Sequence, residues 1–134
     1  MAWTKASLQA VLEDMFLNKD LQDLPAFISQ HFSPDYKETG TINGKVKRFD
    51  EFVQHVIQLR RTIVSGTVTV YQCSQNGCKV AVGYTVDAVT QDGSPMRLDR
   101  IMIGKSEEDG HRFLKLWEAP MPSILAWRRK NVSR

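Results

Sequence analysis

Apolar residues in the first half of the chain recur at the spacing of a helix. Three segments carry apolar residues three and four positions apart, which places them on one helical face, and these segments are 4–16, 23–32 and 50–63. Each segment begins with a residue whose side-chain oxygen can accept a hydrogen bond from the first free backbone N–H groups: Thr4, Asp23 and Asp50. The pattern therefore predicts three helices.

From Gly66 onward the helical spacing gives way to alternation of apolar and polar residues, which is typical of strands. The expected strands are 67–73, 78–90, 95–104 and 112–119. They are joined by "SQNG", "TQDGS" and "SEEDG", and such short turns connect antiparallel neighbours. A short extended segment, "SPDYKETGTINGK", lies between the second and third helices and has a turn at Asn43–Gly44. Helices followed by an antiparallel meander predict an α+β domain.

Two polar residues of the third helix lie close to its apolar stripe. Arg60 falls near the middle of the stripe, and His55 lies at its edge beside Phe52 and Leu59. Arg60 can line a cavity, extend to solvent or cap backbone carbonyls, and His55 can line the same cavity or be a structural group with satisfied hydrogen bonds. The helical pattern alone leaves these alternatives open.

The composition is that of an ordinary globular domain, with 42% hydrophobic and 25% charged residues over 134 positions. No apolar run approaches the roughly 18 residues that a membrane span needs. The start, "MAWTKASLQ", lacks the charged and then apolar plan of a secretory signal. We therefore expect one domain without a membrane span and a cytoplasmic location.

The net charge of +3 is concentrated in the last eleven residues, "ILAWRRKNVSR", which hold four basic residues and no acid. The rest of the chain then carries a net charge of −1. Because a nearly neutral body offers no evident basic face, we expect no nucleic-acid partner. The tail around Trp127 can be solvated, docked on a partner subunit, or in contact with phosphate or an anionic membrane surface.

The two cysteines flank a turn signal. Cys73 and Cys78 can face each other across a hairpin if its loop has four residues. In a chain expected in the cytoplasm, two such residues are more often reduced thiols. No histidine or aspartate lies at ligand spacing around them, and the three histidines are widely scattered, so we expect no metal site.

Alternation sorts the residues of the long third strand onto two faces. Asp99 shares one face with Ile101 and Ile103, while Arg100 shares the opposite face with Met102. Both sets contain apolar side chains beside a charged one. Neither face is marked by the pattern as the one that covers the helices.

In the last strand the same alternation places Glu118 with Leu116, and Trp117 with Phe113 on the other face. Trp117, Phe113 and Met102 are then bulky residues on the face opposite Leu116 and Ile103. Because one of two partly apolar faces needs a cover from outside the chain, we expect a homodimer through the sheet.

Three pieces of the sequence together resemble the nuclear-transport-factor-2-like (cystatin-like) superfamily and, within it, the SnoaL-like bacterial proteins. These pieces are "HFSPDYKETGTINGK", "FDEFVQHVIQLR" and "EDGHRFLKLWEAPMP", and the resemblance covers about residues 4–122. It implies a single domain over 1–122, with three helices and a strongly curved antiparallel sheet that form a cone with a pocket, and a basic tail over 123–134. It also implies a dimer packed through the sheet. The superfamily includes polyketide cyclases, isomerases, dehydratases, epoxide hydrolases and binding modules without catalysis.

In a pocket of this kind, polar residues on an inward face can line a binding site. The expected catalytic residues are Asp99, His55 and Glu118, and the expected ligand-binding residues are Tyr36, Arg60 and Tyr84. A carboxylate in an apolar pocket has a raised pKa, a histidine can shuttle a proton, and an arginine can stabilise developing negative charge. The set predicts acid–base catalysis, as an isomerase or lyase, on a small hydrophobic carbonyl or hydroxy compound, without metal or cofactor.

The catalytic patterns of the resembling enzymes match only in part. Asp99 resembles the second acid that ketosteroid isomerases carry on the long strand, but Gly40 stands where their general base is expected, with Glu38 nearby. SnoaL-like cyclases often end the last strand with Trp-x-x-x-Asp, and here Met121 takes the place of that aspartate. The alternative prediction is therefore a non-catalytic ligand-binding or dimerisation module of the same fold.

Overall fold

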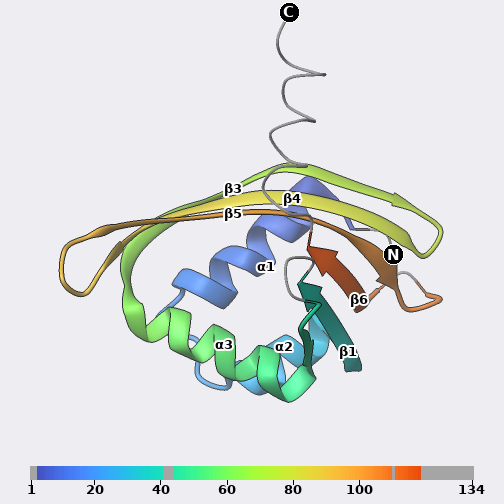
Figure 1. Ribbon diagram of the computed structural model, residues 1–134, viewed down its shortest axis with the longest axis horizontal. Helices are drawn as coiled ribbons and strands as arrows, with labels where there is room; N and C mark the ends of the chain where they lie inside the picture. The colour runs from blue at the N-terminus through green and yellow to red at the C-terminus, as the bar shows by residue number, and fades with distance from the viewer. Residues whose placement is uncertain (1–2, 41–43, 110, 119–134) are drawn as a thin grey trace, which may run out of the picture.

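The computed structural model describes residues 3–40, 44–109 and 111–118, and its elements follow the predicted order (Figure 1). In chain order they are α1 Lys5–Leu17, α2 Leu24–His31, β1 Phe32–Gly40, β2 Val46–Arg48, α3 Phe49–Thr62, β3 Ile63–Asn76, β4 Lys79–Thr90, β5 Pro95–Ser106 and β6 Phe113–Glu118. Within these ranges, none of the helices has the length and apolar character needed to cross a membrane.

Two of the three predicted helix caps are confirmed. The side chains of Thr4 and Asp23 each accept a hydrogen bond, at 3.1 Å, from a backbone N–H in the first turn of α1 and α2. The third was wrong, because α3 follows β2 without a loop and has Arg48 at its N-cap. Asp50 lies in the first turn, and Glu51 accepts a hydrogen bond from the Arg48 N–H at 3.2 Å. Both carboxylates favour the positive end of the helix.

The strands form one sheet in the order β2-β1-β6-β5-β4-β3. The four predicted strands pair as antiparallel neighbours, which confirms the meander. The first strand, β1, pairs with the last, β6, in parallel, so the sheet is mixed. Register shifts in β3, between Ile63 and Ser65 and between Val70 and Gln72, are sites of extra twist and bending. The sheet arches over the three helices, as Figure 1 shows.

The turn of the hairpin between β3 and β4 is too short for the two cysteines to face each other. Asn76 pairs with Lys79, so the turn holds only Gly77 and Cys78. Gly77 has a φ of +62°, a conformation that glycine adopts without strain. Cys73 therefore lies opposite Val82 instead of Cys78, and both cysteines are free thiols.

The core lies between the concave face of the sheet and the helices. Its buried apolar side chains come from all three helices and from the inner face of the strands, and they include Leu8, Leu12, Met15, Phe16, Ile28, Phe32, Phe52, Val56, Ile63, Val82, Val86 and Met102. The predicted helical stripes are thus the faces that the sheet covers. Burial of side chains of this size contributes about 1.5–3 kcal/mol each.

The predicted faces of the last strand were partly wrong. Phe113 and Leu116 are both buried, at 1% and 2% exposure, although strict alternation places them on opposite faces. The pairing of β6 shifts register between Lys105 and Ser106 of β5, and such an irregularity changes the face that a residue occupies. Of the three bulky residues placed together on one face, Phe113 and Met102 are buried and Trp117 is exposed. Ile103, expected on the opposite face, pairs with Trp117 and is exposed beside it.

Candidate functional site

Arg60 has a structural role at the far end of α3. Its Nη1 donates hydrogen bonds to the carbonyls of Asp14 and Met15, at 3.1 and 2.9 Å, and its Nη2 donates to the carbonyl of Asn18 at 2.7 Å. These carbonyls belong to the C-terminal end of α1, where the last turn has no partners of its own. The capping alternative explains why a guanidinium points along the apolar stripe, and the structure does not bring Arg60 to the other candidate residues.

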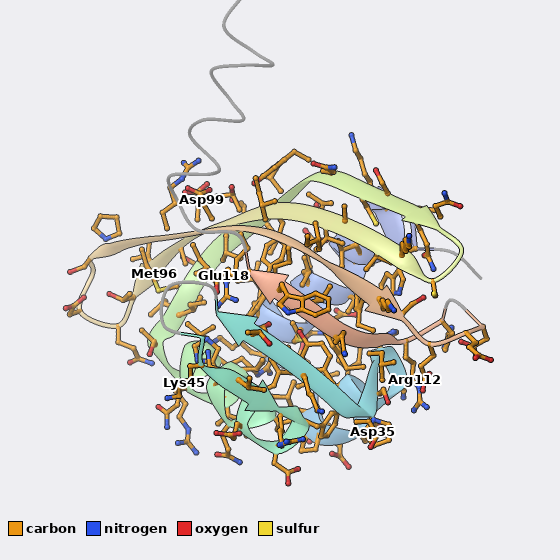
Figure 2. The ribbon with its side chains drawn as sticks, turned by 45° about the vertical axis from the view of Figure 1, so that its right-hand side comes forward. Asp35, Lys45, Met96, Asp99, Arg112 and Glu118 are labelled. Atoms are coloured by element: carbon orange, nitrogen blue, oxygen red, sulfur yellow. The ribbon has the colours of Figure 1, made fainter. Side chains whose placement is uncertain are left out.

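Asp99 lies on the outer face of β5, away from the helices. Its Oδ1 accepts a hydrogen bond from the Thr85 hydroxyl at 2.5 Å, and its Oδ2 accepts one from Nε of the exposed Arg97 at 3.1 Å. Figure 2 shows Asp99 above the β5 ribbon and Glu118 below that ribbon, at the end of β6. The prediction that Asp99 and His55 project into one cavity was wrong, because the inward position of β5 is taken by the next residue, Arg100.

Arg100 is the centre of a polar group on the inner face of the sheet. Its Nη1 donates to Glu38 Oε2 at 3.2 Å and to Glu118 Oε2 at 3.3 Å, and its Nε is buried without a hydrogen-bond partner. Glu38 Oε1 accepts a hydrogen bond from the Tyr36 hydroxyl at 3.0 Å. We call Tyr36, Glu38, Tyr84, Arg100 and Glu118 the Arg100 group. Its members come from β1, β4, β5 and β6, so the parallel β1–β6 pair assembles it.

Burial and charge act together on this group. Burial raises the pKa of Tyr84 to about 12, although the charge of Arg100 opposes the shift. Burial and the neighbouring Glu38 also raise the pKa of Tyr36 well above its usual value. Burial acts to lower the pKa of Arg100, but Tyr84, Glu38 and Glu118 outweigh it and raise that pKa. At neutral pH both tyrosines are therefore neutral hydroxyl groups and Arg100 is a cation.

His55 lies between the Arg100 group and the surface. It is half-buried in the wall of a hollow of about 390 Å³ between β2 and α3, which Lys47 also lines. Burial lowers its pKa, followed by the charges of Lys47 and Arg100, while the charge of Glu38 opposes the shift. The imidazole is therefore neutral at pH 7 and can both accept and donate a hydrogen bond.

Four of the six predicted site residues thus occupy one region. Tyr36, Tyr84 and Glu118 belong to the Arg100 group, and His55 lies within electrostatic reach of it. The prediction missed Arg100 itself as a site residue. The signal that could have found it is an arginine between Leu98 and Met102 on one face of the strand, with no acidic neighbour on that face.

No family model and no curated protein sequence matches the chain. Solved structures do match its fold. One is an NTF2-like protein of unknown function from Exiguobacterium sp. 255-15, with a TM-score of 0.62 and 20% identity, over 83% of this chain and 95% of that one. Another is IdmH from Streptomyces antibioticus, a candidate polyketide cyclase, with a TM-score of 0.65 and 14% identity, over 96% and 99%.

A third is a protein with a ketosteroid isomerase-like fold from Catenulispora acidiphila DSM 44928, solved in complex with trimethylamine. It has a TM-score of 0.61 and 12% identity, over 89% of this chain and 88% of that one. Likeness at these identities concerns the path of the backbone and extends to no residue of the site. The chain has the nuclear-transport-factor-2-like fold that its sequence resembles.

Proposed function

We propose that the chain binds a small hydrophobic molecule against the Arg100 group and exchanges a proton with it without a cofactor. The observation that carries this proposal is the guanidinium of Arg100, which is buried, is held through Nη1 alone, and leaves Nε without an acceptor. A buried donor without a partner is costly for the folded chain unless it serves a ligand. An oxygen of a carbonyl or hydroxy compound is an acceptor of the required kind.

The two carboxylates of the group differ in their freedom to act as a base. Glu38 uses both oxygens, one for the Tyr36 hydroxyl and one for Arg100, and it is almost fully buried. Glu118 uses only Oε2, and its side chain is 36% exposed. Glu118 is therefore the group that accepts a proton from the ligand, and Glu38 is the group that holds Arg100 in place.

The remaining residues complete an acid–base mechanism. Loss of a proton next to a carbonyl leaves negative charge on the carbonyl oxygen, and the cation of Arg100 stabilises that charge. The neutral imidazole of His55, next to the hollow, can pass a proton between the site and solvent. Proton removal and return at another atom is isomerisation, and proton removal with loss of a hydroxyl group is the reaction of a lyase. The substrate is a small hydrophobic carbonyl or hydroxy compound.

A ligand-binding module without catalysis is the second candidate. It is favoured by the outward position of Asp99, which leaves Glu38 and Glu118 as the carboxylates of the Arg100 group. Both of them already bind Arg100. A carboxylate oxygen that already accepts a hydrogen bond from a guanidinium is less free to accept a proton from a ligand. In this case the same ligands bind, but no proton leaves them.

Deuterium exchange separates the two candidates. Wild-type protein in D₂O with small cyclic ketones is expected to exchange the protons next to the carbonyl, followed by NMR. Glu118→Gln is expected to slow the exchange at least about 100-fold and to preserve ligand binding, measured as a thermal shift. Asp99→Asn, which changes an acid on the outer face, is the matched control and leaves the rate unchanged. Binding without exchange assigns the module, and exchange that survives in Glu118→Gln contradicts the role of this residue.

We further propose the homodimer that the sheet suggests. Ile103 and Trp117 are neighbours across β5 and β6, and they are 58% and 38% exposed on the outer face. Light scattering is expected to give twice the mass of the chain at micromolar concentration, and Ile103→Asp is expected to give a monomer. Val64→Asp, at another exposed apolar position, is the control that keeps the dimer. A wild-type monomer at this concentration contradicts the proposal.

A further inference from the structure

Five basic residues stand in register across the sheet. Lys79 of β4 pairs with Lys105 of β5, Lys105 pairs with Lys115 of β6, Lys115 pairs with Lys37 of β1, and Lys37 pairs with Arg48 of β2. Residues paired in this way point to the same face of a sheet. We call these five residues the basic row. The expectation of a body without a basic face was wrong, because a sum of charges does not show how they are placed.

The basic row lies on the outer face and has no acidic partners of its own. Its members are exposed or half-buried, and none of them forms an ion pair with another residue in the part of the chain that the structure describes. Like charges that lie directly opposite each other across strands are destabilising. Four such pairs in succession each lower the stability of the fold through charge repulsion, and an anionic partner would relieve that repulsion.

One end of the basic row lies in a hollow. Lys37, Arg48 and Lys115, from three adjacent strands, line a space of about 380 Å³, and Asp35 is the one acid among its lining residues. Because neighbouring strands are about 4.8 Å apart, the five residues extend over roughly 19 Å across the sheet. A partner therefore has to present several negative charges along a line.

We propose that the basic row binds the sugar-phosphate backbone of a single-stranded nucleic acid, which passes across the strands and through the hollow. Phosphates spaced along a flexible chain match a line of cations, and their neutralisation releases counterions. The sheet curves (Figure 1), so a flat anionic membrane meets only part of its convex face, whereas a flexible strand follows the bend. The proposed contact between copies is centred on Ile103 and Trp117, the next pair along the same face. It offers the row no acid of that face, since Asp87 and Asp99 already pair with Arg97, and the nucleic acid binds the row beside that contact.

The test is the binding of a fluorescein-labelled oligouridine of about 20 nucleotides to the full chain, measured by anisotropy at several salt concentrations. We expect the five contacts of the row to contribute about −3.5 to the slope of log K against log salt. Lys37→Gln with Lys115→Gln is expected to reduce the magnitude of this slope by about 1.4 and to weaken binding tenfold or more at low salt. Lys5→Gln with Arg61→Gln, at two exposed positions of α1 and α3, is the matched control with an unchanged slope.

The design separates the basic row from the basic tail, because both double variants keep the tail. The proposal is overturned if wild-type protein does not bind oligouridine, or if the two double variants lose affinity equally. It is also overturned if polyglutamate or phosphatidylserine vesicles bind as tightly as oligouridine with the same dependence on Lys37 and Lys115. The proposal is overturned as well if Lys37→Gln with Lys115→Gln lowers the molar mass in solution and leaves the affinity for oligouridine unchanged. That result would assign the row to a contact between copies.

Discussion

Replacing Glu38 by leucine is expected to lower the free energy of unfolding by about 3–5 kcal/mol. The carboxylate and the guanidinium of Arg100 have side-chain exposures of only 6% and 9%, so water cannot replace the lost partner. After the substitution Arg100 keeps only the bond to Glu118, and the Tyr36 hydroxyl loses its acceptor inside the core. Urea unfolding followed by circular dichroism measures the change.

A second substitution shows where this energy comes from. Because an apolar pair of similar volume removes the unpaired charge, Glu38→Leu with Arg100→Met is expected to recover about 2 kcal/mol of the lost stability. The remainder, about 1–3 kcal/mol, belongs to the hydroxyl of Tyr36, and adding Tyr36→Phe is expected to recover it. Asp87→Leu breaks an exposed ion pair, and its cost is expected to stay below about 1 kcal/mol. Equal losses of stability in Glu38→Leu and Asp87→Leu would contradict the conclusion that the ion pair of Glu38 and Arg100 is shielded from water.

The local part of the fold could be predicted from the sequence, because it depends on neighbours in the chain. The helical stripes of α1, α2 and α3 and the hairpins from β3 to β6 follow from spacing and turn residues. The parallel pair of β1 and β6 could not be predicted in this way. The 72 residues from 41 to 112 separate these strands, and no turn signal links them, so their pairing follows from the closure of the core.

The candidate site depended on a choice that alternation cannot make. Alternation placed Asp99 and Arg100 on opposite faces of β5, which is confirmed, but both faces have apolar neighbours, and the pattern does not say which one is inside. The resemblance of Asp99 to the second acid of ketosteroid isomerases favoured it as the inward residue. The structure places the arginine inside, since two carboxylates from β1 and β6 meet it there, and only the pairing of distant strands brings them together.

The arrangement of charges on the surface could not be predicted from the sequence either. The body of the chain is nearly neutral in sum, and this is correct as arithmetic. The register of five strands nevertheless separates the charges, with the basic row at one end of the outer face and the acids Asp87 and Asp99 toward the other. Linear sequence contains the identity of each charge but not its neighbours across the sheet. A surface of this kind becomes visible only with the pairing of the strands.

Replacing Arg60 by methionine is expected to lower the free energy of unfolding by about 2–4 kcal/mol. The substitution keeps the length and apolar contacts of the stem and removes three hydrogen bonds from a charged donor to the carbonyls that end α1. It also removes a cation from the negative end of that helix. Arg60→Lys is expected to recover only part of the loss, since one ammonium cannot reproduce the planar fork that holds carbonyls in two directions.

The loss should be confined to the junction of α1 and α3, because the two helix ends support each other there. Lys19, which follows α1, donates hydrogen bonds at 2.6 Å to the carbonyls of Arg60 and Ile63 at the end of α3. When α1 frays in Arg60→Met, Lys19 loses its position as well, and hydrogen exchange is expected to accelerate in the last turns of both helices. Arg61→Met, at the exposed neighbouring position, is the control and changes stability by less than about 0.5 kcal/mol. An equal loss in both variants would show that the side chain of Arg60 stabilises α3 alone, without joining it to α1.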